Sequence, residues 1–402
     1  MLKVLNEIKP SVAEKKAILS TAKHFVSKIN SRLTEGKAVL GGSVAKGTWL
    51  KGDYDIDIFV LFNKEYKNED ISKILETKLE KLKPNKISGI RKVHGSRDYF
   101  QINQDPYNFE IVPILKISKA NKAENITDVS PLHTKWVKKK AKKKLLDEIR
   151  LSKVFAKANK LYGAESYIKG LSGYTLEVLT IHYGSFSRLM ENVAKWKKGV
   201  KIDVEKHNDG LNRSKKGPLI VIDPVQHDRN TAAALSDKKF DKFIGLAKKF
   251  NRNPSLEFFK RENVSLESLK GAVIVKAKAL KGKEDIVGNK LLKAFEFIGK
   301  RLKEEGYEIT KYDWEWDKEA LFWYRVKVKT LPKSYMHFGP PVKEEKHVEK
   351  FREKYKGKKL QKKDGKIYVN LERENPNVVD YLRELLKNNY IKEKVKEINV
   401  LE

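Results

Sequence analysis

Residues 40–62 have the sequence LGGSVAKGTWLKGDYDIDIFVLF, in which a glycine-rich segment is followed by an apolar run with two aspartates. Two glycines and Ser43 directly follow an apolar run. They predict a tight turn from a strand into a helix, where backbone N–H groups and the Ser43 hydroxyl can face phosphate oxygens. From Asp55 to Phe62 the residues are mostly β-branched, aromatic or aliphatic, which predicts a strand. Its period of two places Asp55 and Asp57 on one face, roughly 7 Å apart.

The paired carboxylates predict a metal site. Mg²⁺ prefers one or two protein carboxylates together with substrate phosphates, so Asp55 and Asp57 suit phosphoryl or nucleotidyl transfer. The alternative is a surface hairpin whose strand carries two exposed aspartates, and the Gly-Gly-Ser turn upstream favours the metal site over it. The stretch also nearly fits a Walker A loop, but Thr48 stands where that loop needs a lysine, which excludes it.

The spacing of these residues matches a known pattern. Gly42-Ser43, eleven further residues and Asp55-Ile56-Asp57 resemble the signature of the polymerase-β-like nucleotidyltransferase superfamily. The longer run Gly-Ser-x-Ala-Lys-Gly-Thr-x-Leu-x-Gly-x-x-Asp-Ile-Asp resembles the archaeal, class I form of the CCA-adding enzyme. That family builds the 3′ end of tRNA from CTP and ATP without a nucleic-acid template. The resemblance implies Mg²⁺ as cofactor and the acceptor arm of tRNA as partner.

The resemblance also implies a multidomain α/β and α+β fold. We expect a polymerase-β-like nucleotidyltransferase head with a mixed sheet over residues 1–140 and a helical neck that completes the nucleotide pocket over residues 141–256. An α/β RNA-binding body follows over residues 257–340, and a small tail with a C-terminal helix over residues 341–402. The tail shows the weakest resemblance, because the family's longer C-terminal region, with its aromatic and histidine-rich loop, has no counterpart here.

Composition agrees with a polyanionic partner. The chain of 402 residues carries 86 Lys and Arg against 53 Asp and Glu, a net charge of +33. Such a charge is typical of nucleic-acid binders, although a general lysine bias is the alternative explanation. Cysteine is absent, which excludes disulfides and thiolate catalysis. No run is apolar for long enough to span a bilayer and no secretory signal is evident, so we expect a cytoplasmic protein without a membrane partner.

Periodicity outlines the secondary structure. Ser11 and Glu14 form a capping box ahead of a helical pattern that continues to Leu33. A second helix is expected over residues 71–82, and strands over residues 86–93, 99–102, 108–115 and 219–224. Residues 170–196 predict two helices divided at Gly184-Ser185. The C-terminal part predicts a strand at 272–277, a helix at 290–305, aromatic strands within 312–328, and then a helix, a hairpin and a helix over 378–386.

Glu110 is the natural third carboxylate. It interrupts the apolar run Phe109-Glu110-Ile111-Val112-Pro113, where the family usually carries aspartate. Its role as metal ligand or as general base stays open, as does a place on the solvent face of an edge strand. Asp53 and Asp105 are the next candidates.

The resemblance assigns the nucleotide pocket. Ser43, Lys46, Lys153 and Tyr162 match positions that face the triphosphate. His133 matches the histidine of the family's Pro-x-His-x-Lys-Trp segment, which lies in the pocket. Arg229, in an Arg-Asn-x-Ala-Ala block, matches the arginine that recognises the Watson–Crick edge of the incoming base, a task suited to a planar fork of donors. A surface salt bridge is the alternative for Arg229.

Three other functions stay open. A poly(A)-type nucleotidyltransferase would not need the block around Arg229, and an antibiotic-modifying one would not need so much positive charge. A non-enzymatic RNA-binding protein with an inactive head is disfavoured by the intact Asp55 and Asp57. The sequence leaves open whether all three nucleotides or a subset are added, and whether the chain forms a homodimer.

Overall fold

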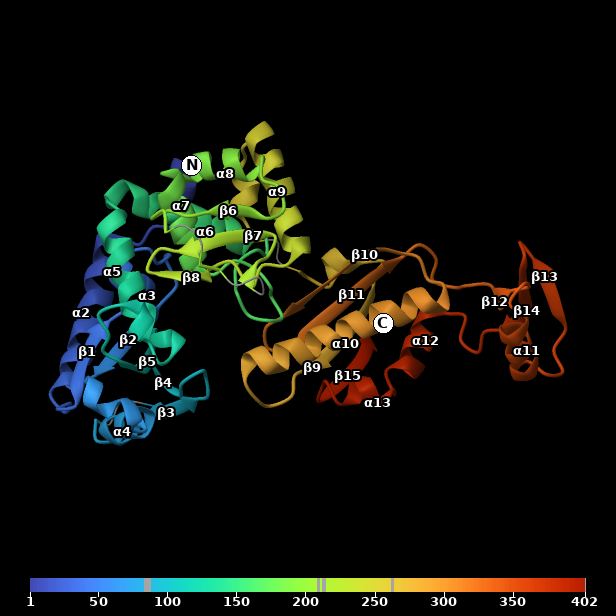
Figure 1. Cartoon of the computed structure of the whole chain (residues 1–402), viewed down its shortest axis with the longest axis horizontal. Coiled ribbons are helices and arrows are strands. Elements are labelled where there is room, and N and C mark those ends of the chain that lie inside the picture. The colour runs from blue at the N-terminus through green and yellow to red at the C-terminus, as the bar shows by residue number, and fades with distance from the viewer. Residues whose placement is uncertain (83–87, 208–209, 212–214, 262–263, 402) are drawn as a thin grey trace. The chain divides into compact units, whose positions relative to one another are not determined.

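The computed structural model describes residues 1–402 apart from 83–87, 208–209, 212–214, 262–263 and 402. Its elements are labelled in Figure 1. The chain divides into two compact units, residues 1–262 and 263–402. Within the described residues, no helix is both long and apolar enough to cross a membrane.

A five-stranded mixed sheet forms the head of the first unit. Its strand order is β1-β2-β5-β4-β3, with β2 parallel to β5 and the other neighbours antiparallel. The strands are β1 (Gly36–Leu40), β2 (Asp55–Phe62), β3 (Ser88–Val93), β4 (Tyr99–Gln104) and β5 (Tyr107–Leu115). The predicted strands are therefore present, although the first two residues of the strand expected at 86–93 lie outside the described residues.

Two long helices and one short helix accompany this sheet: α2 (Val12–Asn30), α3 (Gly42–Lys46) and α4 (Ile71–Glu80). The capping box of Ser11 and Glu14 is present at the start of α2, as predicted. Ile56, Ile58 and Val60 of β2 are fully buried in the core that α2 and α4 cover. The predicted alternation along β2 is confirmed, since its opposite face carries the two aspartates.

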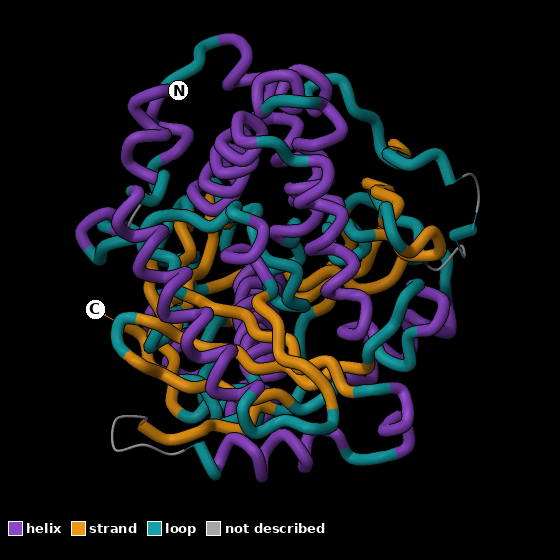
Figure 2. The backbone as a smooth tube through the Cα atoms, turned by 90° about the vertical axis from the view of Figure 1, so that its left-hand side faces the viewer, coloured by secondary structure: helices purple, strands orange, loops and turns teal. Residues whose placement is uncertain are grey.

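Helices dominate the rest of the first unit and gather at the top of Figure 2. A short three-stranded sheet of order β6-β7-β8 joins them. The elements are α1 (Leu2–Ile8), α5 (Ser130–Lys140), α6 (Lys143–Ala158), α7 (Gly173–Tyr183), α8 (Phe186–Val193), α9 (Asp237–Arg252), β6 (Val200–Ile202), β7 (Leu219–Asp223) and β8 (Gln226–Asn230). We call this part of the structure the neck; it includes α1 and α5 in addition to the residues expected there from the sequence. The predicted break between two helices at Gly184-Ser185 is confirmed, because Gly184 takes a left-handed conformation with φ 78° and Ser185 caps α8.

The neck has a hydrophobic core of its own, separate from the head core. Val4 of α1 belongs to the neck core, and α1 packs on α6. Lys9, just after α1, forms an ion pair of 2.6 Å with Asp147 of α6. The chain therefore starts in the neck, enters the head with α2 and returns to the neck after β5.

The second unit contains two sheets. A four-stranded antiparallel sheet has the order β10-β11-β9-β15, and a three-stranded one has the order β12-β14-β13. The strands are β9 (Val273–Lys278), β10 (Ile309–Trp316), β11 (Ala320–Val326), β12 (Ser334–Pro341), β13 (Leu360–Lys363), β14 (Lys366–Glu372) and β15 (Glu397–Leu401). The helices are α10 (Glu284–Glu305), α11 (Glu345–Lys354), α12 (Val378–Leu385) and α13 (Asn389–Lys392).

Short 3-10 helices complete the description: η1 (Lys64–Asn68), η2 (Ala120–Lys122), η3 (Ile126–Val129), η5 (Leu256–Phe259) and η6 (Glu267–Leu269). The division into four domains at residues 140, 256 and 340 stays a prediction. Its last boundary falls inside β12, and β15 of the predicted tail pairs with β9 of the predicted body.

Candidate active site

The glycine turn after β1 packs directly on the carboxylate strand. The Gly41 N–H donates to the Asp57 carbonyl oxygen over 2.8 Å. Gly42 has φ +58°, and a Cβ atom there would lie 1.5 Å from Asp57 Oδ2. A side chain at position 42 would therefore collide with the Asp57 carboxylate, which explains the glycine. Ser43 and Lys46 follow on α3, both half-buried.

Asp55, Asp57 and Glu110 gather at one place in the sheet. Asp57 and Glu110 are direct partners in the parallel pair of β2 with β5, and Asp55 faces Asn108 one pleat away. Both strands lie in the interior of the sheet, so β2 is not an isolated surface hairpin and β5 is not an edge strand. Gln101 donates from Nε2 to Glu110 Oε1 over 2.7 Å.

Charge repulsion accompanies this arrangement. Burial raises the pKa of Asp57 to about 6, and the neighbouring Glu110 and Asp55 carboxylates add to the rise, while Lys46 opposes it. Three neighbouring carboxylates are a chemical environment that a divalent cation compensates, and their hard oxygen donors are those that Mg²⁺ prefers.

The side chains of Asp55, Asp57 and Glu110 do not converge on one point. Among the described residues, no three His, Cys, Asp or Glu side chains are grouped closely enough to hold an ion as they stand. The Asn108 amide donates to Asp55 Oδ1 over 3.2 Å, as Gln101 does to Glu110. The oxygen donors of these carboxylates fit Mg²⁺ by their chemistry. The alternative candidates lie elsewhere: Asp53 pairs with Lys157 over 2.6 Å, and Asp105 is exposed between β4 and β5.

A second cluster joins the head to the neck. Glu177 of α7 is fully buried, and its two carboxylate oxygens each bind one lysine. Lys46 Nζ of α3 lies 2.7 Å from Glu177 Oε2, and Lys153 Nζ of α6 lies 2.7 Å from Oε1. The Thr48 hydroxyl donates to the same Oε1 over 2.6 Å and accepts from Lys153 over 2.9 Å.

The electrostatics of Glu177 follow from this pairing. Burial alone would raise its pKa, but Lys153 and Lys46 outweigh burial and lower it to about 2. Burial lowers the pKa of Lys153, whose side chain is 6 % exposed, while that of Lys46 is 10 % exposed. The structure therefore brings together two of the residues expected to face a triphosphate.

Tyr162 lies beside this cluster. A Cβ atom on Gly173 would lie 2.7 Å from the Tyr162 hydroxyl oxygen and 3.7 Å from Lys153 Cε. The Tyr162 hydroxyl and the aliphatic part of Lys153 therefore both lie beside the start of α7. Burial raises the pKa of Tyr162, which keeps its hydroxyl protonated and able to donate. Lys157 Nζ lies 5.2 Å from the centre of the Tyr162 ring.

A third cluster centres on Asp223 at the end of β7. This aspartate is fully buried, and its Oδ2 binds both His133 Nε2 of α5 and Arg229 Nη1 of β8, each over 2.8 Å. The Tyr174 hydroxyl donates to Oδ1 over 3.2 Å. The alternative expectation for Arg229 was a surface salt bridge. Arg229 does form a salt bridge, but its partner Asp223 is buried, and the Arg229 side chain is 31 % exposed.

The protonation states in this cluster are determined by its partners. Burial lowers the pKa of His133 despite the Asp223 carboxylate. Burial would raise the pKa of Asp223, but His133, the Val225 N–H and Arg229 together hold it below its ordinary value. A neutral His133 must then donate its Nε2 proton to the ionised Asp223. The Tyr174 ring packs on His133 with centroids 4.1 Å apart, and Lys46 Nζ lies 5.8 Å from that ring, so Tyr174 bridges the second and third clusters.

The prediction of site residues missed Glu177 and Asp223. A signal existed for Glu177, because it interrupts the apolar helix sequence Thr-Leu-Glu-Val-Leu-Thr-Ile just as Glu110 interrupts its strand. Asp223 ends an apolar strand ahead of Pro224, which indicates a turn but not a partner. Arg229 lies only six residues after Asp223, but Lys46 lies 131 positions from Glu177 and His133 lies 90 positions from Asp223, so only the fold identifies these two partners.

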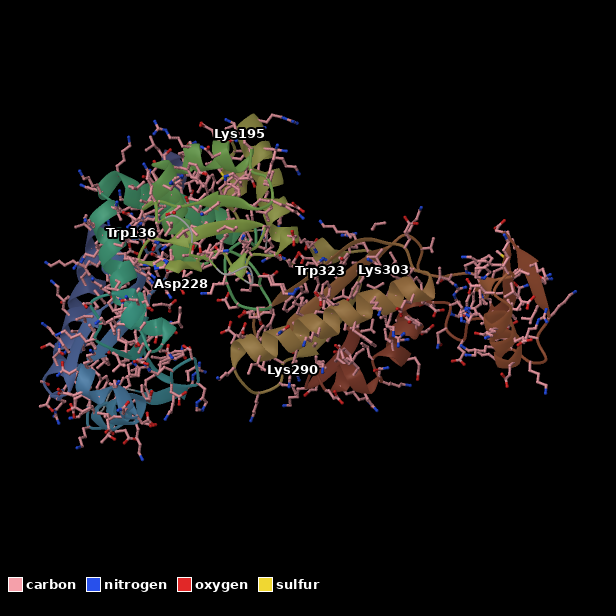
Figure 3. All side chains as sticks on the ribbon, in the orientation of Figure 1. Trp136, Lys195, Asp228, Lys290, Lys303 and Trp323 are labelled. Atoms are coloured by element: carbon pink, nitrogen blue, oxygen red, sulfur yellow. The ribbon has the colours of Figure 1, made fainter. Side chains whose placement is uncertain are left out.

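A separate cavity of about 910 Å³ lies along another face of α5, lined by the 118–126 segment, by Leu132, Lys135 and Trp136, and by the β7–β8 turn with Asp228. Figure 3 labels Trp136 and Asp228, on α5 and β8. None of the predicted site residues lines this cavity. The Trp136 indole donates to Glu205 over 2.8 Å.

Family models match three consecutive parts of the chain. Residues 19–133 match the nucleotidyltransferase domain, residues 147–260 the second domain of tRNA nucleotidyltransferase, and residues 271–398 the C-terminal domain of the CCA-adding enzyme. The CCA-adding enzyme of Nanoarchaeum equitans is 39% identical over 342 residues, which are 82% of this chain and 82% of the relative. The chain belongs to the CCA-adding enzyme family.

Other CCA-adding enzymes of archaea are similar over more of the length. That of Methanocaldococcus jannaschii is 34% identical over 408 residues, covering 96% of this chain and 90% of the relative. The match to the C-terminal domain of the CCA-adding enzyme includes residues 341–398, where the sequence pattern by itself showed the weakest resemblance.

Solved structures support the fold of this CCA-adding enzyme family member. A cytoplasmic RNA terminal U-transferase superposes with a TM-score of 0.51 at 14% identity, over 65% of this chain and 98% of that one. The Cid1 poly(U) polymerase superposes with a TM-score of 0.51 at 15% identity, over 65% and 97%. The predicted multidomain α/β fold with a nucleotidyltransferase head is confirmed.

Proposed function

We propose that this chain adds C, C and A to the 3′ end of tRNA from CTP and ATP, by metal-dependent nucleotidyl transfer without a nucleic-acid template. The observation that carries the proposal is the parallel pairing that sets Asp57 opposite Glu110, with Asp55 one pleat away and the Gly42 turn against Asp57. The clusters around Glu177 and Asp223 supply cationic and hydrogen-bonding groups, and Tyr174 links the two clusters. Lys46 of the Glu177 cluster is close enough to Asp57 to influence the pKa of Asp57.

The carboxylates are proposed to act on the reacting phosphate. Asp55, Asp57 and Glu110 would hold Mg²⁺, which neutralises charge on the transferred phosphoryl group and the attacking oxygen when it is bound. Glu110 stands at the edge of this set and is either a ligand or the base that takes the proton from the tRNA 3′ hydroxyl. In both roles the chemistry consists mainly of positioning and charge compensation.

The two other clusters are proposed to hold the nucleotide. Ser43, Lys46 and Tyr162 are proposed to contact the triphosphate, and Lys153, whose three protons already have protein acceptors, is proposed to support them by its charge. Arg229 and the neutral His133, both fixed by Asp223, lie on the side of the base. Arg229 still has N–H groups beyond the one that binds Asp223, so it can donate to a base edge without leaving its carboxylate partner.

The proposed partners are tRNA, ATP and CTP, and the proposed location is the cytoplasm. A net charge of +33 supports a polyanionic substrate. Addition of all three nucleotides is the proposed activity; addition of a subset and the formation of a homodimer are decided by experiments on the purified protein.

The experiment that tests the function uses tRNA transcripts that end before the first C, before the second C and before the A. Each is incubated with the protein, Mg²⁺ and labelled CTP or ATP. We expect CTP to extend the first two transcripts and ATP the third, with Asp55→Ala inactive on all of them. Runs of adenylate on any RNA would instead indicate a poly(A)-type enzyme, and RNA binding without incorporation would indicate an inactive head.

A salt series on the same tRNA tests the basic surface. Binding should weaken steeply as salt rises, because each neutralised phosphate releases counterions. Asp55→Ala should bind tRNA nearly as well as the parent protein. A flat salt profile would show that the excess lysine is a compositional bias without a role in RNA binding.

A further inference from the structure

Glu177 is an unusual partner for two groups assigned to a triphosphate. It is a fully buried carboxylate, and it comes from the neck, whereas Lys46 and Thr48 come from the head. A buried charge is retained at a high cost in desolvation unless it is compensated. Here both oxygens are compensated, one by Lys46 and the other by Lys153 and Thr48.

The two lysines are bound differently. Lys153 Nζ has three acceptors around it: Glu177 Oε1 at 2.7 Å, Thr48 Oγ1 at 2.9 Å and the Thr48 carbonyl oxygen at 3.4 Å. An ammonium group has three protons, so these contacts use all of them. Lys46 Nζ has one hydrogen-bond acceptor within the described part of the chain, Glu177 Oε2. Two protons of Lys46 therefore remain for an anion.

The geometry points to Glu177 as a positioning residue for nucleotidyl transfer: it anchors Lys46 toward the triphosphate, while Lys153 and Thr48 hold the carboxylate in place from behind. This inference rests on the proposed function and deepens it. Lys46 lies four residues after Gly42, whose turn packs on Asp57, so the Lys46 backbone is fixed relative to the catalytic carboxylates. Its ammonium group is fixed by Glu177.

Charge balance explains why the anchor is an acid. Lys46, Lys153 and Glu177 together carry a net charge of one positive unit, and Lys46 is the group that has protons left to donate to an anion. Replacement of Glu177 by glutamine does not free a second cation for the nucleotide, because the buried Lys153 then loses its counter-charge and burial favours its neutral form. The variant therefore leaves a similar net charge but removes the anchor of Lys46.

A purely structural role is the competing explanation, since the same contacts connect head and neck. The two explanations differ in the measured constants. A weakened head–neck contact lowers the amount of active protein and hence kcat. A misplaced Lys46 weakens the hold on the triphosphate and raises the KM for CTP and for ATP by the same factor, because the triphosphate is common to both.

The test is a double-mutant cycle with Glu177→Gln, Lys46→Met and the two combined. KM and kcat are measured for CTP and ATP on truncated tRNA. We expect each single change to raise both KM values by about tenfold, the loss of roughly one charge-assisted hydrogen bond, and the combined variant to be no worse than Lys46→Met. Unchanged KM in Glu177→Gln, or losses that multiply in the combined variant, would overturn the inference.

Glu205→Gln is the matched control. Glu205 is also a neck carboxylate that binds a lysine, Lys140, over 2.7 Å, and it accepts from the Trp136 indole. Its KM values should equal those of the parent protein. If Glu177→Gln does not fold in a thermal scan, the cycle is run with Lys46→Met and Lys153→Met. Both lysines bind the Glu177 carboxylate, Lys46 at Oε2 and Lys153 at Oε1, so non-additive KM values support the inference and independent effects overturn it.

A readout without catalysis separates this inference from the proposed function. Inorganic triphosphate should raise the Tm of the parent protein and of Glu205→Gln, and raise that of Glu177→Gln and Lys46→Met less. If the parent protein shows this shift but incorporates no nucleotide, the proposed function fails and the anchor stands. If the parent protein incorporates nucleotides but all four proteins shift equally, the anchor fails and the function stands.

Discussion

Asp57 of β2 and Glu110 of β5 are direct partners across a parallel strand pair. Adjacent strands lie about 4.8 Å apart, so two carboxylates in this register repel each other unless a cation or a proton intervenes. This repulsion contributes to the raised pKa of Asp57. The ionised form of Asp57 is therefore disfavoured both by its burial and by its partner across the strand pair.

Asp57→Asn should abolish nucleotide incorporation and raise the Tm of the metal-free protein at pH 7.5. The folded-state pKa of about 6 lies above the ordinary value of 3.8, so ionisation of Asp57 costs stability as pH rises between these values. The asparagine removes that cost. We expect a gain of several °C, because a rise in pKa from 3.8 to about 6 corresponds to roughly 3 kcal/mol and each kcal/mol to about 2–4 °C for a unit of this size. A lower Tm than that of the parent protein in EDTA would contradict the prediction.

Glu110→Gln should lose most of the rate of the chemical step at near-normal tRNA affinity, because it keeps the side-chain length and removes the charge. Glu110→Asp should be partly active, since its carboxylate is withdrawn by about 1.5 Å, one carbon–carbon bond. Single-turnover incorporation at saturating Mg²⁺ compares both with the parent protein. A full rate in Glu110→Gln would move the third carboxylate elsewhere, with Asp53 or Asp105 to be tested next.

Arg229→Ala should impair base selection more than chemistry. Loss of a bidentate contact costs on the order of 1 to 3 kcal/mol of discrimination, so incorporation of UTP or GTP should rise relative to CTP and ATP. Asp223→Asn should act in the same direction, because Arg229 and His133 both depend on Asp223 Oδ2. Arg252→Ala, at an exposed position at the end of α9, is the control. Equal slowing for every nucleotide would make Arg229 structural.

Acid should destabilise the first unit partly through Glu177. Its folded-state pKa of about 2 lies below the ordinary 4.5, so its stabilisation is complete above about pH 4.5 and is lost as pH falls toward 2. The Tm difference between the parent protein and Glu177→Gln should therefore shrink over that window. Glu205→Gln corrects for the titration of other carboxylates. A difference that does not change with pH would show that Glu177 acts by packing alone.

Local patterns predicted the elements and the carboxylate strand well. The alternation along β2 and the capping box before α2 depend on residues that are near each other in the sequence, and such residues carry their own signal. Glu110 was predicted because one charge interrupts an apolar run. That it lies opposite Asp57 requires the parallel pairing of β2 with β5, which the sequence of neither strand specifies.

The partners of the residues that are proposed to bind the nucleotide could not be predicted in this way. Lys46 meets Glu177, and His133 meets Asp223, across large separations in sequence, and no spacing rule connects them. Lys153 was expected to face the triphosphate, but one of its acceptors is Glu177 of α7 and the other two belong to Thr48 of the head, so its contacts follow from how α6 packs against both. Whether a polar side chain is buried depends on how the elements of the neck pack together, so it cannot be predicted from the sequence of one segment.

The path of the chain between head and neck has a mechanical consequence. Because α1 packs in the neck and α2 in the head, two separate segments connect these parts, one between α1 and α2 and one after β5. Buried contacts also cross between the two parts, because Arg150 of α6 donates from Nε to the Trp49 carbonyl oxygen over 3.0 Å and Glu177 of α7 binds Lys46 of α3 over 2.7 Å. The head and the neck are therefore held together within one compact unit by two chain segments and by buried polar contacts.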